Sequence, residues 1–118
     1  MRILNIDDST VNNMLMENIL STLGHETLSI LEGTGVIEKI REFHPDAVIL
    51  DIMMPGKSGL DILEEIRHAG IQVPVIVITA MSSQELKRKA LELGAADYQS
   101  KPVKMKTLQH SLEQVLQA

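Results

Sequence analysis

The fold is decided by the stretch Val48-Ile49-Leu50-Asp51-Ile52-Met53-Met54-Pro55-Gly56-Lys57-Ser58-Gly59. It opens with a short apolar run that ends in one carboxylate, Asp51, and it continues through a turn into a new helix. Such a run predicts a strand that is buried on both faces, as in a parallel sheet. Asp51 would then lie at the carboxyl end of that strand, where open parallel α/β sheets bind their ligands.

The same unit of strand followed by helix recurs five times along the chain. We expect strands at 2–6, 27–31, 47–50, 74–78 and 97–99, each followed by an apolar stripe with helical spacing. Ser9, Ser58 and Ser82 are the predicted N-caps of the first, third and fourth helices. This alternation predicts a flavodoxin-like, doubly wound (βα)5 fold with a five-stranded parallel sheet of order 2-1-3-4-5. We expect residues 1–118 to form one domain.

The composition argues against several classes of protein. The chain has 118 residues, a net charge of −5, only 2% aromatic residues and no cysteine. These values disfavour a nucleic-acid surface and exclude both a disulfide framework and a thiolate metal site. No apolar run approaches the roughly 20 residues of a membrane span, and no signal peptide is evident. We therefore expect a cytoplasmic protein that binds neither nucleic acid nor membrane directly.

Four of the predicted strands end in side chains that could take part in catalysis or ion binding. These are Asp7 and Asp8, Asp51, Thr79 and Lys101. The carboxyl ends of parallel strands share one edge of the sheet, so we expect these side chains to meet. Three adjacent carboxylates repel one another unless a hard cation such as Mg²⁺ lies among them. A divalent cation, an ammonium and a hydroxyl suit a transferring phosphoryl group, and the remaining carboxylate is then a candidate nucleophile.

The chain resembles the receiver domains of response regulators in two-component signalling over essentially its whole length. The matching motifs are the acidic pair Asp7-Asp8, the D-x-x-M-P-x-x-x-G stretch from Asp51 to Gly59, Thr79-Ala80, and Tyr98 followed by Lys101-Pro102. Each motif is weak alone, but all of them occur in order at the expected strand ends. The resemblance implies a signalling switch and not an enzyme acting on an external substrate.

The resemblance also implies the chemistry of each residue. Asp51 would accept a phosphoryl group from a phosphohistidine of a sensor histidine kinase or a histidine phosphotransfer domain. Mg²⁺ (or Mn²⁺) would be held by Asp8, Asp51 and the backbone carbonyl of Met53, with Asp7 contributing through a water molecule. Lys101 would bind a phosphoryl oxygen.

Four further positions are implied in a conformational switch. Thr79 would move toward the phosphoryl group, Tyr98 would turn inward, and the small Ala80 would leave room for that turn. Pro102 follows Lys101 in a peptide bond that is a candidate for the cis form. The switch would then alter the surface formed by the fourth helix, the fifth strand and the fifth helix, and this surface would control an effector protein or output domain.

Other interpretations stay open from the residues alone. Asp51 could cap the next helix, the acidic pair could be ordinary first-turn charges, and Tyr98 fits a half-buried packing residue equally well. A hydrolase is disfavoured because Met53 stands where a second catalytic acid is expected, and the complete acceptor set disfavours a phosphorylation-independent binding module. Met53 and Met81 are apolar neighbours of the site, which predicts slow hydrolysis of the phosphoryl-aspartate. Both a stand-alone receiver and a piece of a longer regulator or hybrid kinase fit the sequence.

Overall fold

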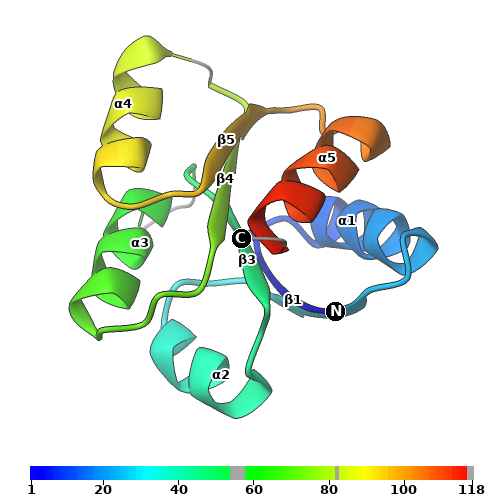
Figure 1. The fold of residues 1–118 in the computed structure, drawn as a ribbon, viewed down its shortest axis with the longest axis horizontal. Helices are drawn as coiled ribbons and strands as arrows, with labels where there is room; N and C mark the ends of the chain where they lie inside the picture. The colour runs from blue at the N-terminus through cyan, green and yellow to red at the C-terminus, as the bar shows by residue number, and fades with distance from the viewer. Residues whose placement is uncertain (54–57, 82, 117–118) are drawn as a thin grey trace.

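The structure, a computed structural model, describes residues 1–53, 58–81 and 83–116 (Figure 1). Within these ranges, five strands and five helices alternate along the chain. The strands are β1 (Arg2–Ile6), β2 (Glu26–Ile30), β3 (Ala47–Asp51), β4 (Val75–Thr79) and β5 (Asp97–Ser100). The helices are α1 (Thr10–Thr22), α2 (Val36–Phe43), α3 (Gly59–His68), α4 (Gln84–Glu92) and α5 (Met105–Leu116). Each predicted element is present, with shifts of one or two residues at the boundaries.

The five strands form one parallel sheet of order β2-β1-β3-β4-β5, which confirms the predicted topology. Ile6 pairs with Leu50, and Leu50 pairs with Val77 on the next strand. This register brings the carboxyl ends of β1, β3 and β4 level with one another. Because the order reverses between β1 and β3, a crevice for ligands is expected at that point.

Helices cover both faces of the sheet: α2, α3 and α4 lie on one side, and α1 and α5 lie on the other (Figure 1). Alternate side chains of each strand enter two different apolar cores, because successive residues point to opposite faces. On β1, Leu4 and Ile6 join the core with α2 and α3, whereas Ile3 joins the core with α1 and α5. Asn5 and Asp7 therefore point to the α1 and α5 side.

Serine side chains begin three of the helices. Ser9 accepts from the backbone N–H of Asn12, and Ser58 accepts from that of Leu60, as predicted. The third predicted cap is wrong by one residue, because Ser83 is the N-cap of α4 and accepts from the Leu86 N–H at 3.0 Å. Ser83 has the extended backbone that an N-cap requires, and the predicted cap Ser82 lies outside the described residues. None of the helices within the described ranges has the length and apolarity to cross a membrane.

Candidate functional site

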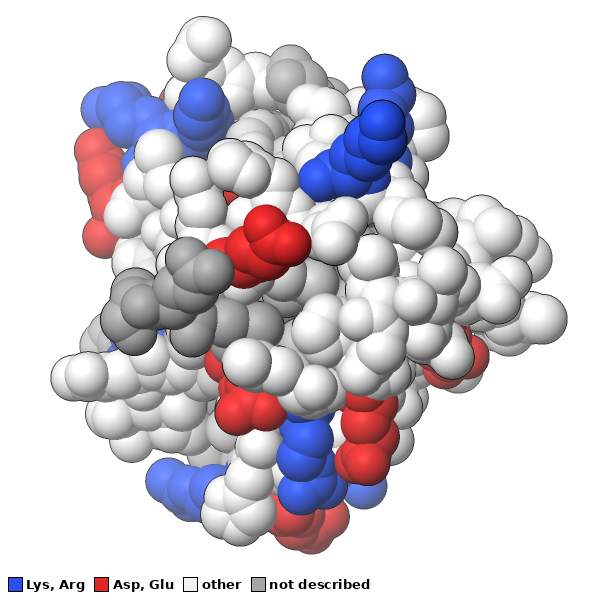
Figure 2. Space-filling model, turned by 45° about the vertical axis from the view of Figure 1, so that its right-hand side comes forward, with Lys and Arg blue, Asp and Glu red and all other residues white. Residues whose placement is uncertain are grey.

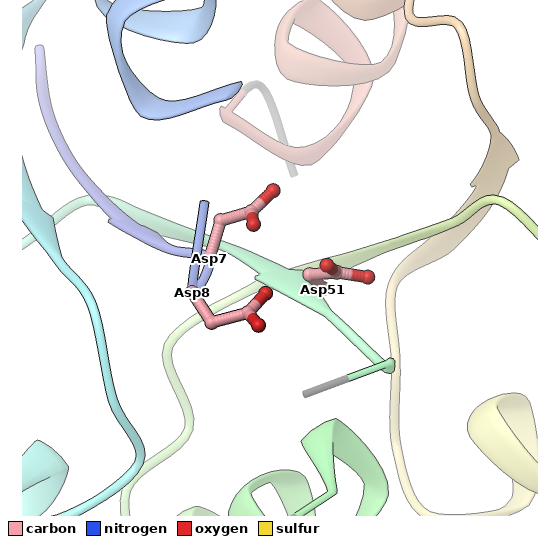
Figure 3. Close-up of side chains that lie close together, drawn as sticks. All are labelled: Asp7, Asp8 and Asp51. Carbon is pink, nitrogen blue, oxygen red and sulfur yellow. The ribbon is translucent and has the colours of Figure 1, made fainter. Parts of the chain in front are cut away.

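Three carboxylates meet at the carboxyl edge of the sheet. Asp7 and Asp8 follow the end of β1, and Asp51 is the last residue of β3. Each offers an oxygen that lies within 4.8 Å of the others (Figure 3). The predicted proximity of the acidic pair and Asp51 is therefore confirmed.

Lys101 joins this cluster from the loop after β5. Its Nζ lies 3.1 Å from Oδ2 of Asp7 and 3.2 Å from Oδ2 of Asp51. Asp7 and Asp51 are only 6% and 5% exposed, whereas Asp8 is exposed. One ammonium thus bridges the two buried carboxylates and leaves the third open to solvent.

The environment shifts the pKa values of the central pair. Burial raises the pKa of Asp51, and the N–H of Met53, donating at 3.1 Å, and the charge of Lys101 only partly oppose this effect. Burial by itself would lower the pKa of Lys101, but its hydrogen bond to Asp7 and the charges of both carboxylates raise it overall. Lys101 is therefore a cation at neutral pH, and the site as a whole keeps an excess of negative charge.

The excess of negative charge at the site is carried by carboxylate oxygens, which are the ligands that a hard divalent cation prefers. Mg²⁺ is bound in proteins through one or two carboxylates, with water and phosphate oxygens completing its shell. The exposed position of Asp8 leaves room for such waters, and Asp7 and Asp51 add two buried carboxylates. The donor set of Asp7, Asp8 and Asp51 is thus suited to Mg²⁺ or Mn²⁺.

The predicted switch residues meet at the backbone of Met81. Thr79, the last residue of β4, is fully buried, and its Oγ1 accepts from the N–H of Met81 at 3.1 Å. The Tyr98 hydroxyl donates to the carbonyl oxygen of Met81 at 3.1 Å. Ala80, which lies between Thr79 and Met81 in the sequence, is exposed. The Thr79 hydroxyl therefore has its contact in its own loop and not at Asp51.

Comparison with known proteins agrees with this arrangement of residues. The model of the response regulator receiver domain family matches residues 3–113. The chain belongs to that family. Receivers are signalling domains that accept a phosphoryl group, bind Mg²⁺ at an acidic cluster, and take phosphate from histidine kinases to act on output domains or partners.

Relatives and solved structures resemble this receiver over most of its length. It is 41% identical over 103 residues to the Regulator of RpoS of Escherichia coli, covering 87% of this chain and 31% of that protein. It is 33% identical over 108 residues to the response regulator MprA of Mycobacterium leprae, covering 92% and 47%. The chain thus spans about a third to a half of these curated relatives.

The structural neighbours share the whole fold. The BeF3-activated N-terminal receiver domain of RstA from Klebsiella pneumoniae superimposes with a TM-score of 0.93 at 28% identity, with 100% of both chains covered. The chemotaxis protein CheY4 of Vibrio cholerae gives a TM-score of 0.90 at 26% identity, with 98% of both chains covered. The flavodoxin-like fold predicted from the sequence is confirmed.

The loops around the site carry several further features that the sequence predicted. The Lys101-Pro102 peptide bond is cis, as expected. Met53 and Met81 are both exposed in the loops after β3 and β4. Met54 and Pro55 of the matching motif lie outside the described residues. The role of the Met53 carbonyl as a metal ligand stays a prediction.

A cavity of about 430 Å³ extends from the acidic cluster on the α1 and α5 side of the sheet. Leu15, Met16 and Ile19 of α1 form one apolar wall, and Pro102 and Val103 line it from the loop before α5. Asp7, Asp51 and Lys101 are among the lining residues. The central carboxylates therefore border both this cavity and the surface at which Asp8 lies.

Buried amide side chains near the site make four hydrogen bonds that were not predicted from the sequence. Asn5 donates to Asn13, and Asn13 donates to the backbone carbonyl of Asp7. Gln99 of β5 donates to the carbonyl oxygen of Thr107 at 3.3 Å and to the hydroxyl of Ser111, both on α5. For Asn5 the available signal was an amide between the apolar residues Leu4 and Ile6, whereas Gln99 lies between Tyr98 and Ser100 and stands out less.

Proposed function

We propose that this receiver captures a phosphoryl group on Asp51 and uses it to control a partner or output domain. The observation that carries the proposal is the arrangement of Asp7, Asp8 and Asp51 within 4.8 Å, with the Lys101 ammonium bridging two of them. Asp51 is the carboxylate at the end of the central strand β3, which pairs with β1 on one side and with β4 on the other. It is therefore the proposed nucleophile.

The chemistry assigns one task to each neighbour. An Oδ of Asp51 attacks phosphorus, so that an O–P bond forms while the N–P bond of the phosphohistidine donor breaks and the imidazole keeps the electron pair. We propose Asp8, Asp51 and the Met53 carbonyl as the Mg²⁺ ligands, with Asp7 acting through water. Bound Mg²⁺ supplies charge neutralisation on the phosphoryl oxygens. Lys101 exchanges its contact with Asp51 for a phosphoryl oxygen.

The switch would follow from the contacts at Met81. A phosphoryl group adds about 1.5 to 2 negative charges at neutral pH, and a hydroxyl donor close to it is stabilised. A shift of the Thr79 Oγ1 toward that group would alter its contact with the N–H of Met81, and with it the position of the Met81 carbonyl that accepts from the Tyr98 hydroxyl. Phosphorylation would in this way favour a second arrangement of the loop after β4 and of the surface formed by α4, β5 and α5.

The donor we propose is a histidine kinase or a histidine phosphotransfer domain in the cytoplasm. Beside the site, α1 exposes the apolar side chains of Val11, Met14 and Leu15. Figure 2 shows a broad area with few charged side chains on the side of the molecule where α1 lies. A protein donor that packs on this area would bring its phosphohistidine to the adjacent acidic cluster. We propose that residues 1–118 act as one receiver domain that promotes only its own phosphoryl transfer and hydrolysis.

The test is the intact mass of the protein after incubation with acetyl phosphate. With Mg²⁺ we expect one labile phosphoryl adduct, and without Mg²⁺ or with Asp51→Asn we expect none. Replacing the carboxylate by an amide keeps the shape of the side chain and removes the nucleophile. An adduct of equal yield on Asp51→Asn would contradict the assignment. A folded wild-type protein that stays unmodified, both by acetyl phosphate and by phosphohistidine donors, would favour a phosphorylation-independent binding module.

A further inference from the structure

Two buried asparagines lie behind the acidic pair. Asn5 of β1 is 2% exposed, and Asn13 in the first turn of α1 is 4% exposed. Nδ2 of Asn5 donates to Oδ1 of Asn13 at 2.5 Å, and Nδ2 of Asn13 donates to the backbone carbonyl oxygen of Asp7 at 2.9 Å. Two hydrogen bonds in series therefore connect the interior of β1, through α1, to the loop that carries the acidic pair.

Stability alone does not explain this polar pair. The neighbours of Asn5 on β1 are Ile3, Leu4 and Ile6, which are almost completely buried. Burying an amide costs free energy unless it is hydrogen-bonded, and an apolar pair of similar shape is commonly neutral or stabilising in its place. An apolar pair would lack both hydrogen bonds, and the second of these is the one that reaches outside the pair, to the Asp7 carbonyl.

That carbonyl belongs to the peptide that joins Asp7 to Asp8. The N–H of Asp7 donates to the Ile30 carbonyl at 3.2 Å, and the Asp7 Oδ1 accepts from the N–H of Ser9 at 2.9 Å. With the bond from Asn13 and the Lys101 ammonium at Oδ2, the backbone and the carboxylate of Asp7 are held at four points. Because the same peptide carries Asp8, its orientation sets the direction in which the Asp8 side chain leaves the loop.

Holding this peptide matters because the two adjacent carboxylates repel each other. Like charges within a few Å favour conformations that separate them. The structure nevertheless keeps oxygens of Asp7, Asp8 and Asp51 within 4.8 Å, and a rigid peptide opposes their separation. A cation then meets ligands that are already in place, which reduces the free energy that binding spends on ordering the loop.

We propose that Asn5 and Asn13 are positioning residues of the metal site, because they orient the Asp7–Asp8 peptide toward Asp51. The inference rests on the proposed function, since it requires a divalent cation at the acidic cluster. Groups that orient metal ligands typically contribute 10–100-fold to metal affinity. Loss of the pair therefore weakens Mg²⁺ binding by about 10–100-fold and leaves the phosphorylation rate at saturating Mg²⁺ close to that of the wild type.

The test uses the double variant Asn5→Leu with Asn13→Leu, which has similar side-chain volume and leaves neither amide unpaired. The matched control is Asn18→Leu, the same substitution at an exposed position of α1. Thermal unfolding followed by circular dichroism at increasing Mg²⁺ gives the apparent affinity through the stabilisation that a bound ligand produces. Accumulation of phosphoryl adduct from acetyl phosphate is measured over the same Mg²⁺ series.

We expect the Mg²⁺ midpoint of the double variant to rise about 10–100-fold in both measurements, with the control unchanged. If the double variant does not fold, Asn13→Ala removes both the donor to the Asp7 carbonyl and the acceptor of the Asn5 amide, and its midpoint is expected to rise as well. A wild-type protein that responds to Mg²⁺ beside folded variants with the same midpoint would overturn the inference and leave the proposed function intact. A wild-type protein that Mg²⁺ does not stabilise would overturn both.

Discussion

Replacing Gly59 by alanine is expected to destabilise the receiver and to slow its phosphorylation. Gly59 is the first residue of α3, and its N–H donates to the Ile52 carbonyl at 2.9 Å. A Cβ at this position would lie 2.3 Å from the carbonyl oxygen of Asp51 and 2.7 Å from the Cα of Ile52. Both contacts are with backbone atoms, so no side chain can rotate away to relieve them.

The size of the effect follows from these distances. A separation of 2.3 Å is 0.7 Å short of the 3.0 Å below which Cβ contacts essentially never occur, so the backbone at Asp51 has to move. Overpacking of this kind costs about 1–3 kcal/mol, whereas helix propensity alone would favour alanine by about 0.5–1 kcal/mol. A net loss of about 1 kcal/mol lowers the Tm of a domain of this size by roughly 4 °C. A displaced nucleophile is expected to slow phosphoryl capture by about 10- to 100-fold.

The assay compares Gly59→Ala with Gly24→Ala. Gly24 has a φ of +87° and no atom within 4 Å of an added Cβ, so alanine there meets only backbone strain of about 1–2 kcal/mol. Both variants are expected to lower the Tm, but only Gly59→Ala is expected to slow adduct formation at saturating Mg²⁺. A Gly59→Ala protein with the stability and phosphorylation rate of the wild type would refute the close approach of α3 to Asp51.

Three further predictions concern the charge, a loop contact and the lifetime of the adduct. Burial raises the folded-state pKa of Asp51, so the free energy of unfolding falls as the pH rises from the ordinary aspartate pKa through the raised one. Asp51→Asn should therefore raise the metal-free Tm at neutral pH. In acid, where Asp51 is protonated in both states, this gain in Tm should vanish. An unchanged Tm at pH 7 would contradict the burial effect. Arg67 donates to the carbonyls of Ile71, Val73 and Gly94, so Arg67→Met should cost about 2 kcal/mol in urea unfolding, against about 0.5 kcal/mol or less for the exposed Arg88→Met. Equal losses for the two would refute the role of these bonds. Replacing the exposed apolar neighbours of the site, Met53→Asn with Met81→Glu, should speed loss of the phosphoryl adduct several-fold, and an unchanged half-life by intact mass would show that they do not govern attack by water.

The main acidic groups of the site were predictable because hydrophobic patterning fixes their place. Asp7 and Asp51 each follow an apolar run, and a parallel sheet brings the ends of such runs to one edge. The position of Lys101 depended on a weaker signal, the short fifth strand before it. Its bridging contact with Asp7 and Asp51 could not be predicted, since a lysine side chain has many rotamers and only the folded site selects one.

The buried asparagines show what patterning omits. Asn5 interrupts an apolar strand, and its partner Asn13 lies on the next element, so no periodicity connects them. The choice of Ser83 over Ser82 as the N-cap of α4 depends on one pair of backbone dihedral angles, which adjacent serines do not reveal. Gln99 is another buried amide in a strand, and its partner Ser111 lies on α5. Such partners are tertiary, and local sequence does not specify them.

The most direct test of the central claim is to locate the phosphoryl group on the chain. Protein treated with acetyl phosphate and Mg²⁺ is reduced with borohydride, which converts an aspartyl phosphate to homoserine, and is then mapped by peptide mass spectrometry. The account predicts homoserine at position 51 and unmodified aspartate at positions 7 and 8. Homoserine at Asp7 or Asp8, or a stable phosphate on another residue while Asp51 stays unmodified, would contradict it.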